Sequence, residues 1–182
     1  MTRRKILLLS ARCFITVALA ASLAGPRLVG AVGLDQQQAE LANALSSAKV
    51  SLQQGFVASE REGQPISGKF EVEDGKLQLS VYTAKDGKFF EVIVDHMTGN
   101  IAKVDPITEG EDITNAKSQK AAMDRAKVKL ADAATKAKGK AKGEATDVLV
   151  VSAAPELKGD RPEATIVLLS AKKFSSVSER LD

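Results

Sequence analysis

The chain has 182 residues, which is enough for one domain or for two small ones. It carries 26 basic and 23 acidic residues, a net charge of +3, and only 4% of its residues are aromatic. The single cysteine, Cys13, lies near the N-terminus, inside the export signal described next. Because the rest of the chain has no cysteine, it cannot form disulfides, thiolate metal sites or cysteine nucleophiles.

Residues 1–33 have the pattern of a cleaved signal peptide. A basic start at 3–5 precedes an apolar run at 14–24, and small residues at 31–33 or at 22–24 fit a cleavage site. The run is shorter than the roughly 20 apolar residues that a spanning helix needs, so an uncleaved anchor is the alternative. Without the five basic residues of this leader, 21 basic and 23 acidic residues leave a net charge of −2. We predict a periplasmic or secreted protein, with no support for nucleic-acid binding.

Residues 36–54 predict one amphipathic helix, with Gly55 as its stop. Its apolar stripe consists of Leu41, Leu45, Ala48 and Leu52. A connection at 56–66 is expected to lead from this helix to the strands.

Strand-like runs of alternating apolar and polar residues follow at 69–73, 76–81 and 89–95. Asp-Gly pairs at 74–75 and 86–87 separate them. These pairs predict tight hairpins, because both central positions of a type I′ turn need positive φ.

A short strand at 100–104 is predicted to end at Pro106, since proline cannot donate to a ladder. Residues 106–114 are predicted to be an acidic linker, and residues 115–138 a second helix rich in Ala and Lys. Three more strands are expected at 146–151, 164–169 and 174–177, with a turn at 155–160.

The two halves look like a degenerate repeat. Residues 48–52, AKVSL, match residues 126–130, AKVKL, and the segments that start there and end at Asp105 and Asp182 have 58 and 57 residues. The sequence therefore predicts an α+β fold of two tandem units, 34–105 and 115–182. Each unit is expected to pack a helix on a small antiparallel β-sheet.

Residues 92–101, VIVDHMTGNI, follow the pattern apolar-x-apolar-Asp-x-x-Thr-Gly-x-apolar. This run resembles the closing strands of the PepSY family, with Asp95, Thr98 and Gly99 as a structural turn motif. The resemblance covers residues 40–105, and the second half, which lacks the motif, would be a divergent PepSY-like unit. It implies an exported or membrane-attached, non-catalytic module that binds proteins or inhibits peptidases, with no cofactor.

His96, the single histidine, is the residue to weigh for metal binding or catalysis. A histidine metal site usually needs further histidines or clustered carboxylates, and adjacent Asp95 and His96 would point to opposite faces of a strand. Nucleophilic catalysis would need a nucleophile and an orienting group that the sequence does not offer. We therefore predict an exposed turn residue, no catalytic residue and no metal site.

Residues 117–142 hold nine basic and two acidic residues, a net charge of +7. We define the basic patch as Lys127, Lys136, Lys138, Lys140 and Lys142. Such a run could attract acidic partners or anionic lipid, or be a solvated helix face. Nucleic-acid binding by stacking would need aromatic residues that this run lacks.

The sequence thus predicts a non-catalytic exported protein that binds a protein or peptide of the cell envelope, with peptidase inhibition as one possible outcome. Exposed strand edges are the expected contact surfaces, through strand addition. The alternative is an envelope-surface protein held by weak contact between residues 117–142 and anionic lipid. A hydrolytic enzyme that depends on His96 is the third hypothesis.

Overall fold

The computed structural model of the chain describes residues 31–141 and 147–182. Residues 1–30 of the predicted signal peptide and Lys142 of the basic patch lie outside the described residues. The helices are α1 (Ala31–Ala44), η1 (Leu45–Ser47), α2 (Leu52–Ser59), η2 (Glu60–Glu62), α3 (Gly110–Arg125) and α4 (Leu130–Ala141). The strands are β1 (Gln64–Glu73), β2 (Lys76–Lys85), β3 (Lys88–Val94), β4 (Ile101–Ile107), β5 (Val148–Lys158), β6 (Arg161–Ser170) and β7 (Lys173–Arg180).

All of these strands belong to one antiparallel sheet with the order β4-β3-β2-β1-β5-β6-β7. The predicted α+β class is confirmed, but the strands form one continuous sheet where two small sheets were expected. At its centre β1 meets β5 over only two residue pairs, Gly68–Ala153 and Lys69–Ser152. Beyond this short seam the two strands diverge.

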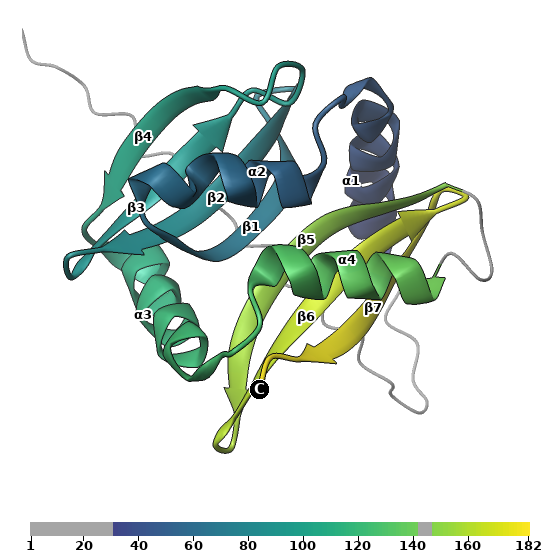
Figure 1. The fold of residues 1–182 in the computed structure, drawn as a ribbon. Helices are drawn as coiled ribbons and strands as arrows, with labels where there is room; N and C mark the ends of the chain where they lie inside the picture. The colour runs from purple at the N-terminus through teal and green to yellow at the C-terminus, as the bar shows by residue number, and fades with distance from the viewer. Residues whose placement is uncertain (1–30, 142–146) are drawn as a thin grey trace, which may run out of the picture.

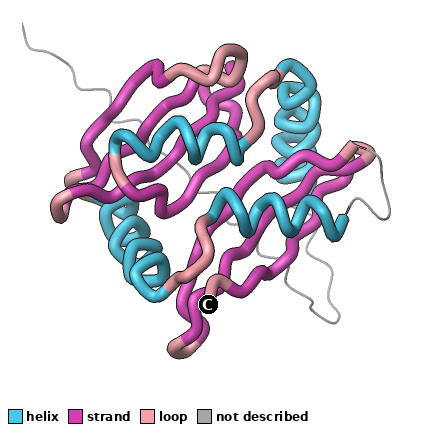
Figure 2. The backbone as a smooth tube through the Cα atoms, in the orientation of Figure 1, coloured by secondary structure: helices cyan, strands magenta, loops and turns pink. Residues whose placement is uncertain are grey.

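Helices α2 and α4 lie side by side on one face of the sheet and run in opposite directions (Figure 1). Helix α1 contacts β1 and β2, and α3 contacts β5, β1 and β6. Figure 2 shows the same arrangement by secondary structure, with each of the paired helices crossing one half of the strands. The buried apolar core between helices and sheet includes Leu52, Phe56, Leu79, Leu130 and Ile166.

The helix predicted at 36–54 is in fact broken in two. Ala48 leaves the helical conformation, with φ −69° and ψ 129°, and the chain is extended until α2 begins at Leu52. Ser51 caps α2, because its hydroxyl accepts from the N–H of Gln54 while the Gln54 side chain accepts from the N–H of Ser51.

Gly55 does not stop the helix but lies inside α2, at its contact with the sheet. A Cβ atom at this position would lie 2.9 Å from Cδ2 of Leu79 on β2. The glycine is therefore a close-approach residue that lets the helix backbone pack near the strand.

The helix predicted at 115–138 is broken in the same way, at Ala126, where φ is −73° and ψ is 140°. Ala126 follows Ala48 by 78 positions. In each break, two consecutive backbone N–H groups donate to one backbone carbonyl. The residue with this carbonyl follows β3 in the first half and β7 in the second half. Lys49 and Val50 donate to the carbonyl of His96, at 2.9 and 3.0 Å. Lys127 and Val128 donate to the carbonyl of Leu181, at 2.6 and 3.0 Å.

The same spacing of 78 positions relates the buried faces of the two helices that follow these breaks. The buried positions are Leu52, Gly55, Phe56 and Ser59 in α2, and Leu130, Ala133, Ala134 and Ala137 in α4. Every buried position of one helix thus has a buried counterpart in the other, although only the leucine is identical in the two helices.

Other boundaries also differ from the prediction. Pro106 does not end its strand, because β4 continues to Ile107 and, as an edge strand, tolerates a residue without an N–H. The predicted linker at 106–114 includes the end of β4 and the first turn of α3. The turn predicted at 155–160 is shorter, since β5 extends to Lys158.

The two Asp-Gly hairpin predictions are confirmed. Asp74 and Gly75 have φ of 50° and 73°, and Asp86 and Gly87 have φ of 50° and 72°. Both central residues of each turn are thus in the left-handed region that a type I′ turn requires.

Candidate functional site

The Asp95-Thr98-Gly99 motif forms the turn between β3 and β4. Oδ1 of Asp95 accepts from the backbone N–H groups of Met97 and Thr98, at 2.7 and 3.0 Å. These two donors hold the pKa of the Asp95 carboxyl below its usual value. Gly99, with φ of 79°, donates its N–H to the Asp95 carbonyl at 2.8 Å. The side-chain carboxylate and the backbone carbonyl of Asp95 therefore both accept hydrogen bonds that stabilise the turn.

His96 is half-buried, so the prediction of an exposed turn residue was wrong in this respect. It takes part in the turn through its backbone carbonyl, which accepts hydrogen bonds from the N–H groups of Lys49 and Val50. Its Nδ1 atom is buried and has no hydrogen-bond partner in the part of the chain that the structure describes. No group of three or more His, Cys, Asp and Glu side chains that could hold a metal ion occurs within residues 31–141 and 147–182.

Two lysines of the basic patch converge on one buried carboxylate. Glu179 of β7 is only 2% exposed, and it forms ion pairs with Lys136, at 3.0 Å, and with Lys140. Burial would raise the pKa of Glu179, but hydrogen bonds from Lys140 and Lys136 outweigh it and hold the pKa below the usual range. These lysines fasten α4 to β7, so their charge is partly neutralised.

The remaining described lysines of the patch lie apart. Lys127 sits in the break before α4, where its backbone N–H bonds to Leu181. Lys138 lies at the edge of a pocket and forms no ion pair with any described residue. Among the described lysines of the patch, only Lys136 and Lys140 thus share a partner.

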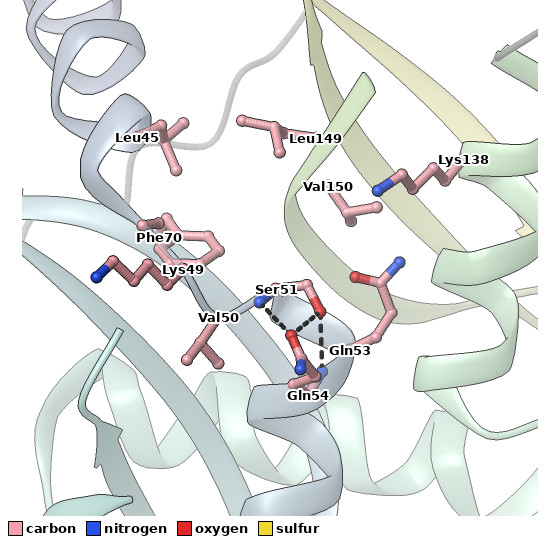
Figure 3. Close-up of a pocket in the computed structure, with 11 residues that line it drawn as sticks. Leu45, Lys49, Val50, Ser51, Gln53, Gln54, Phe70, Lys138, Leu149 and Val150 are labelled. Carbon is pink, nitrogen blue, oxygen red and sulfur yellow. Dashed lines mark hydrogen bonds between the residues drawn. The ribbon is translucent and has the colours of Figure 1, made fainter. Parts of the chain in front are cut away.

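The pocket that contains Lys138 lies between the two halves of the molecule, and we call it the Phe70 pocket (Figure 3). Its volume is about 130 Å³. Its apolar walls are formed by Leu45, Val50, Phe70, Leu149 and Val150. Polar groups of Lys49, Ser51, Gln53, Gln54 and Lys138 complete the lining, and no acidic residue is among them.

A second pocket, the Pro65 pocket, lies where the end of α2 meets the break before α4. It has a volume of about 320 Å³, and its apolar lining includes Phe56, Pro65, Met123 and Leu130. Glu60 and Lys129 face each other in it, with 2.8 Å between Oε1 and Nζ. The hydrogen bond to the Glu60 carboxylate, together with its negative charge, raises the pKa of Lys129.

The strand pattern alone did not indicate a buried polar pair on the sheet face that α3 approaches. The Tyr82 hydroxyl donates to Oε1 of Glu91 at 3.2 Å, and Glu91 is 1% exposed. Burial, followed by the charges of Glu91 and Glu71, raises the pKa of Tyr82 well above its ordinary value. Glu91 shares its strand face with Phe89 and Ile93. It is buried because Ser67, which pairs with Tyr82, forms a hydrogen bond with Gln119 of α3, and that helix therefore lies over this face.

The sheet has two edges, β4 and β7. Residues Phe174–Ser178 of β7 carry no charge and include no proline. The edge strand β4 contains Pro106 and an ion pair between Lys103 and Asp105, at 2.7 Å. Charge and proline both discourage further pairing at an edge, so β7 is the more receptive of the two.

No protein-family model, curated protein or solved structure matches this chain. The PepSY resemblance therefore stays a prediction. Of the helices in the described residues, none is both long enough and apolar enough to cross a membrane.

Proposed function

We propose that the chain is a non-catalytic exported protein, periplasmic or secreted, that binds an extended segment of an envelope protein. The contact is strand addition at the outer edge of β7. The observation that carries the proposal is this edge, where β7 has a partner strand, β6, on only one side among the described residues. An incoming strand would bond to the backbone there, and the side chains of the edge would select its sequence.

We also propose that the chain consists of two tandem PepSY-like units that share one sheet. The support is the repeated helix break, with its pair of N–H groups on one carbonyl, and the matched buried faces of α2 and α4. In this assignment β1–β3 correspond to β5–β7. Strand β4, which covers the outer edge of β3, then marks where a partner strand would lie against β7.

The middle of β7 suits such a partner. Ser175 and Ser176 are exposed and small, whereas Phe174 and Val177 pack partly against the core. A strand that added here would meet a backbone edge with little steric hindrance. Glu179 partly neutralises the charges of Lys136 and Lys140, which favours a peptide at this edge over anionic lipid on the basic patch.

Site-specific photocrosslinking in living cells tests the proposal. A photoreactive residue replaces Ser176 on β7, and the matched control carries it at Lys103, which is exposed on the opposite edge β4. We expect a discrete crosslinked envelope protein from position 176 and none from position 103. Crosslinks from neither position, or from position 103 alone, would refute strand addition at β7.

A further inference from the structure

The Phe70 and Pro65 pockets occupy equivalent places in the repeat of 78 positions. Leu45 in one corresponds to Met123 in the other, and both contribute an apolar wall. Each pocket is closed on one side by a helix break and on the other by the far end of the neighbouring helix, α4 or α2. The two pockets can therefore be compared residue by residue.

The comparison shows that the ion pair of one pocket is missing from the other. In the Pro65 pocket, Lys129 at the start of α4 pairs with Glu60 beyond the end of α2. The corresponding residues in the Phe70 pocket are Ser51 and Lys138. The acidic position has thus become basic, and the basic position has become neutral, which leaves Lys138 without a counterion among the residues that line it.

Few polar groups in the lining of the Phe70 pocket are available to form a hydrogen bond with the Lys138 ammonium. The Ser51 hydroxyl and the side-chain oxygen of Gln54 are bonded to each other, at 2.9 Å, within the cap of α2. The side chains of Gln53 and Lys138 are directed toward the same end of the pocket, next to Val150 (Figure 3). An ammonium and an amide therefore lie beside an apolar cavity, a combination suited to a carboxylate attached to an apolar group.

We propose that the Phe70 pocket binds the C-terminal carboxylate of a peptide whose last side chain is apolar. The carboxylate would lie against Lys138 and Gln53, and the side chain would lie among Leu45, Phe70 and Leu149. The volume of about 130 Å³ is the reason to choose a peptide end. Pockets for drug-sized ligands measure about 300–1,000 Å³, so this one has room for a single side chain and not for a lipid chain.

This binding mode does not depend on β7. Strand addition reads the peptide backbone and is indifferent to a free C-terminus, whereas the Phe70 pocket requires one. The two proposals can therefore fail separately, and one set of peptides distinguishes them.

The test measures binding of the full exported chain to a fluorescent hexapeptide that ends in leucine, as the free acid and as the C-terminal amide. We expect the free acid to bind at least tenfold more tightly than the amide. Lys138→Gln should remove this preference, and Lys129→Gln, the matched change in the Pro65 pocket, should leave it unchanged. Lys129 is exposed, and Lys138 is half-buried but forms no ion pair with a described residue, so neither change is expected to unfold the protein.

Three outcomes would overturn the proposal. The first is equal affinity for the acid and the amide, which would assign any binding to the strand edge. The second is a preference for the acid that survives Lys138→Gln. The third is displacement of the peptide by decanoate at a lower concentration than by the unlabelled peptide, which would identify the ligand as a fatty acid.

Discussion

The carbonyl oxygen of His96 lies 3.0 Å from the backbone nitrogen of Val50 and accepts its hydrogen bond. The histidine that stands out in the sequence thus contributes through a group that every residue has. His96→Ala should therefore leave the break before α2 intact and change the free energy of unfolding by less than about 1 kcal/mol. Urea denaturation followed by circular dichroism measures this change.

The matched variant is Asp95→Ala, which removes the acceptor of the Met97 and Thr98 N–H groups. It should lower the urea midpoint clearly more than His96→Ala does. A larger loss for the histidine variant would contradict the backbone role that we assign to His96.

Leu181 holds the second break as His96 holds the first, but its side chain is also fully buried. Leu181→Ala keeps the carbonyl and creates a cavity, so we expect a loss of about 2–5 kcal/mol in the free energy of unfolding. Urea denaturation measures it, with Leu149→Ala on the exposed start of β5 as the control for a smaller loss. A cost near zero would mean that the chain end does not pack as described.

Gly68 lies where the seam of the sheet meets α2. A Cβ atom there would lie 2.7 Å from Cε1 of Phe56, a side chain that is only 1% exposed. Gly68→Ala should therefore destabilise the protein by about 1–3 kcal/mol, the usual cost of overpacking. The thermal midpoint should fall accordingly, and an unchanged midpoint would show that Phe56 can move.

Gly139 provides the opposite case. It lies in α4, and a Cβ atom there would have no neighbour within 4 Å. Gly139→Ala should stabilise the protein by about 0.5–1 kcal/mol, because alanine loses less backbone entropy in a helix. A raised thermal midpoint, measured beside Gly68→Ala, is the expected result, and a fall would mean that α4 is not helical at this position.

Glu179 should make stability depend on pH in the acid range. Its pKa is lower in the folded protein than in the unfolded chain, so the unfolded state binds more protons between the two values. This contribution is present above the ordinary glutamate pKa of about 4.3 and is lost as pH falls through the folded value. Glu179→Gln should flatten the acid limb of a plot of urea midpoint against pH. An acid limb as steep as that of the unchanged protein would assign the acid sensitivity to other groups.

The sequence predicted the local features that short-range chemistry determines. The Asp-Gly pairs at 74–75 and 86–87 form the expected turns because their backbone needs are met within the pair itself. Every strand that was predicted exists, although all of them except β3 are longer than expected. The α+β class follows from these elements.

The helix breaks could not be predicted in the same way. Ala48 and Ala126 belong to the residue type with the highest helix propensity, and the groups that favour their extended conformation are the carbonyls of His96 and Leu181, far along the chain. The burial of Glu91 depends in the same way on α3, a helix from another part of the sequence. The unpaired charge of Lys138 in the Phe70 pocket also depends on contacts between distant segments, because Lys138 meets residues 48–51 only in the folded chain.

The narrow seam at the centre of the sheet has a mechanical consequence. The β1–β5 contact has two residue pairs, whereas β1 pairs with β2 at nine positions. Under a pulling force across the sheet, the load would therefore concentrate on very few backbone hydrogen bonds at this line, supported by the contact between α2 and α4. The molecule should yield there first, into two halves that each keep their own strands together.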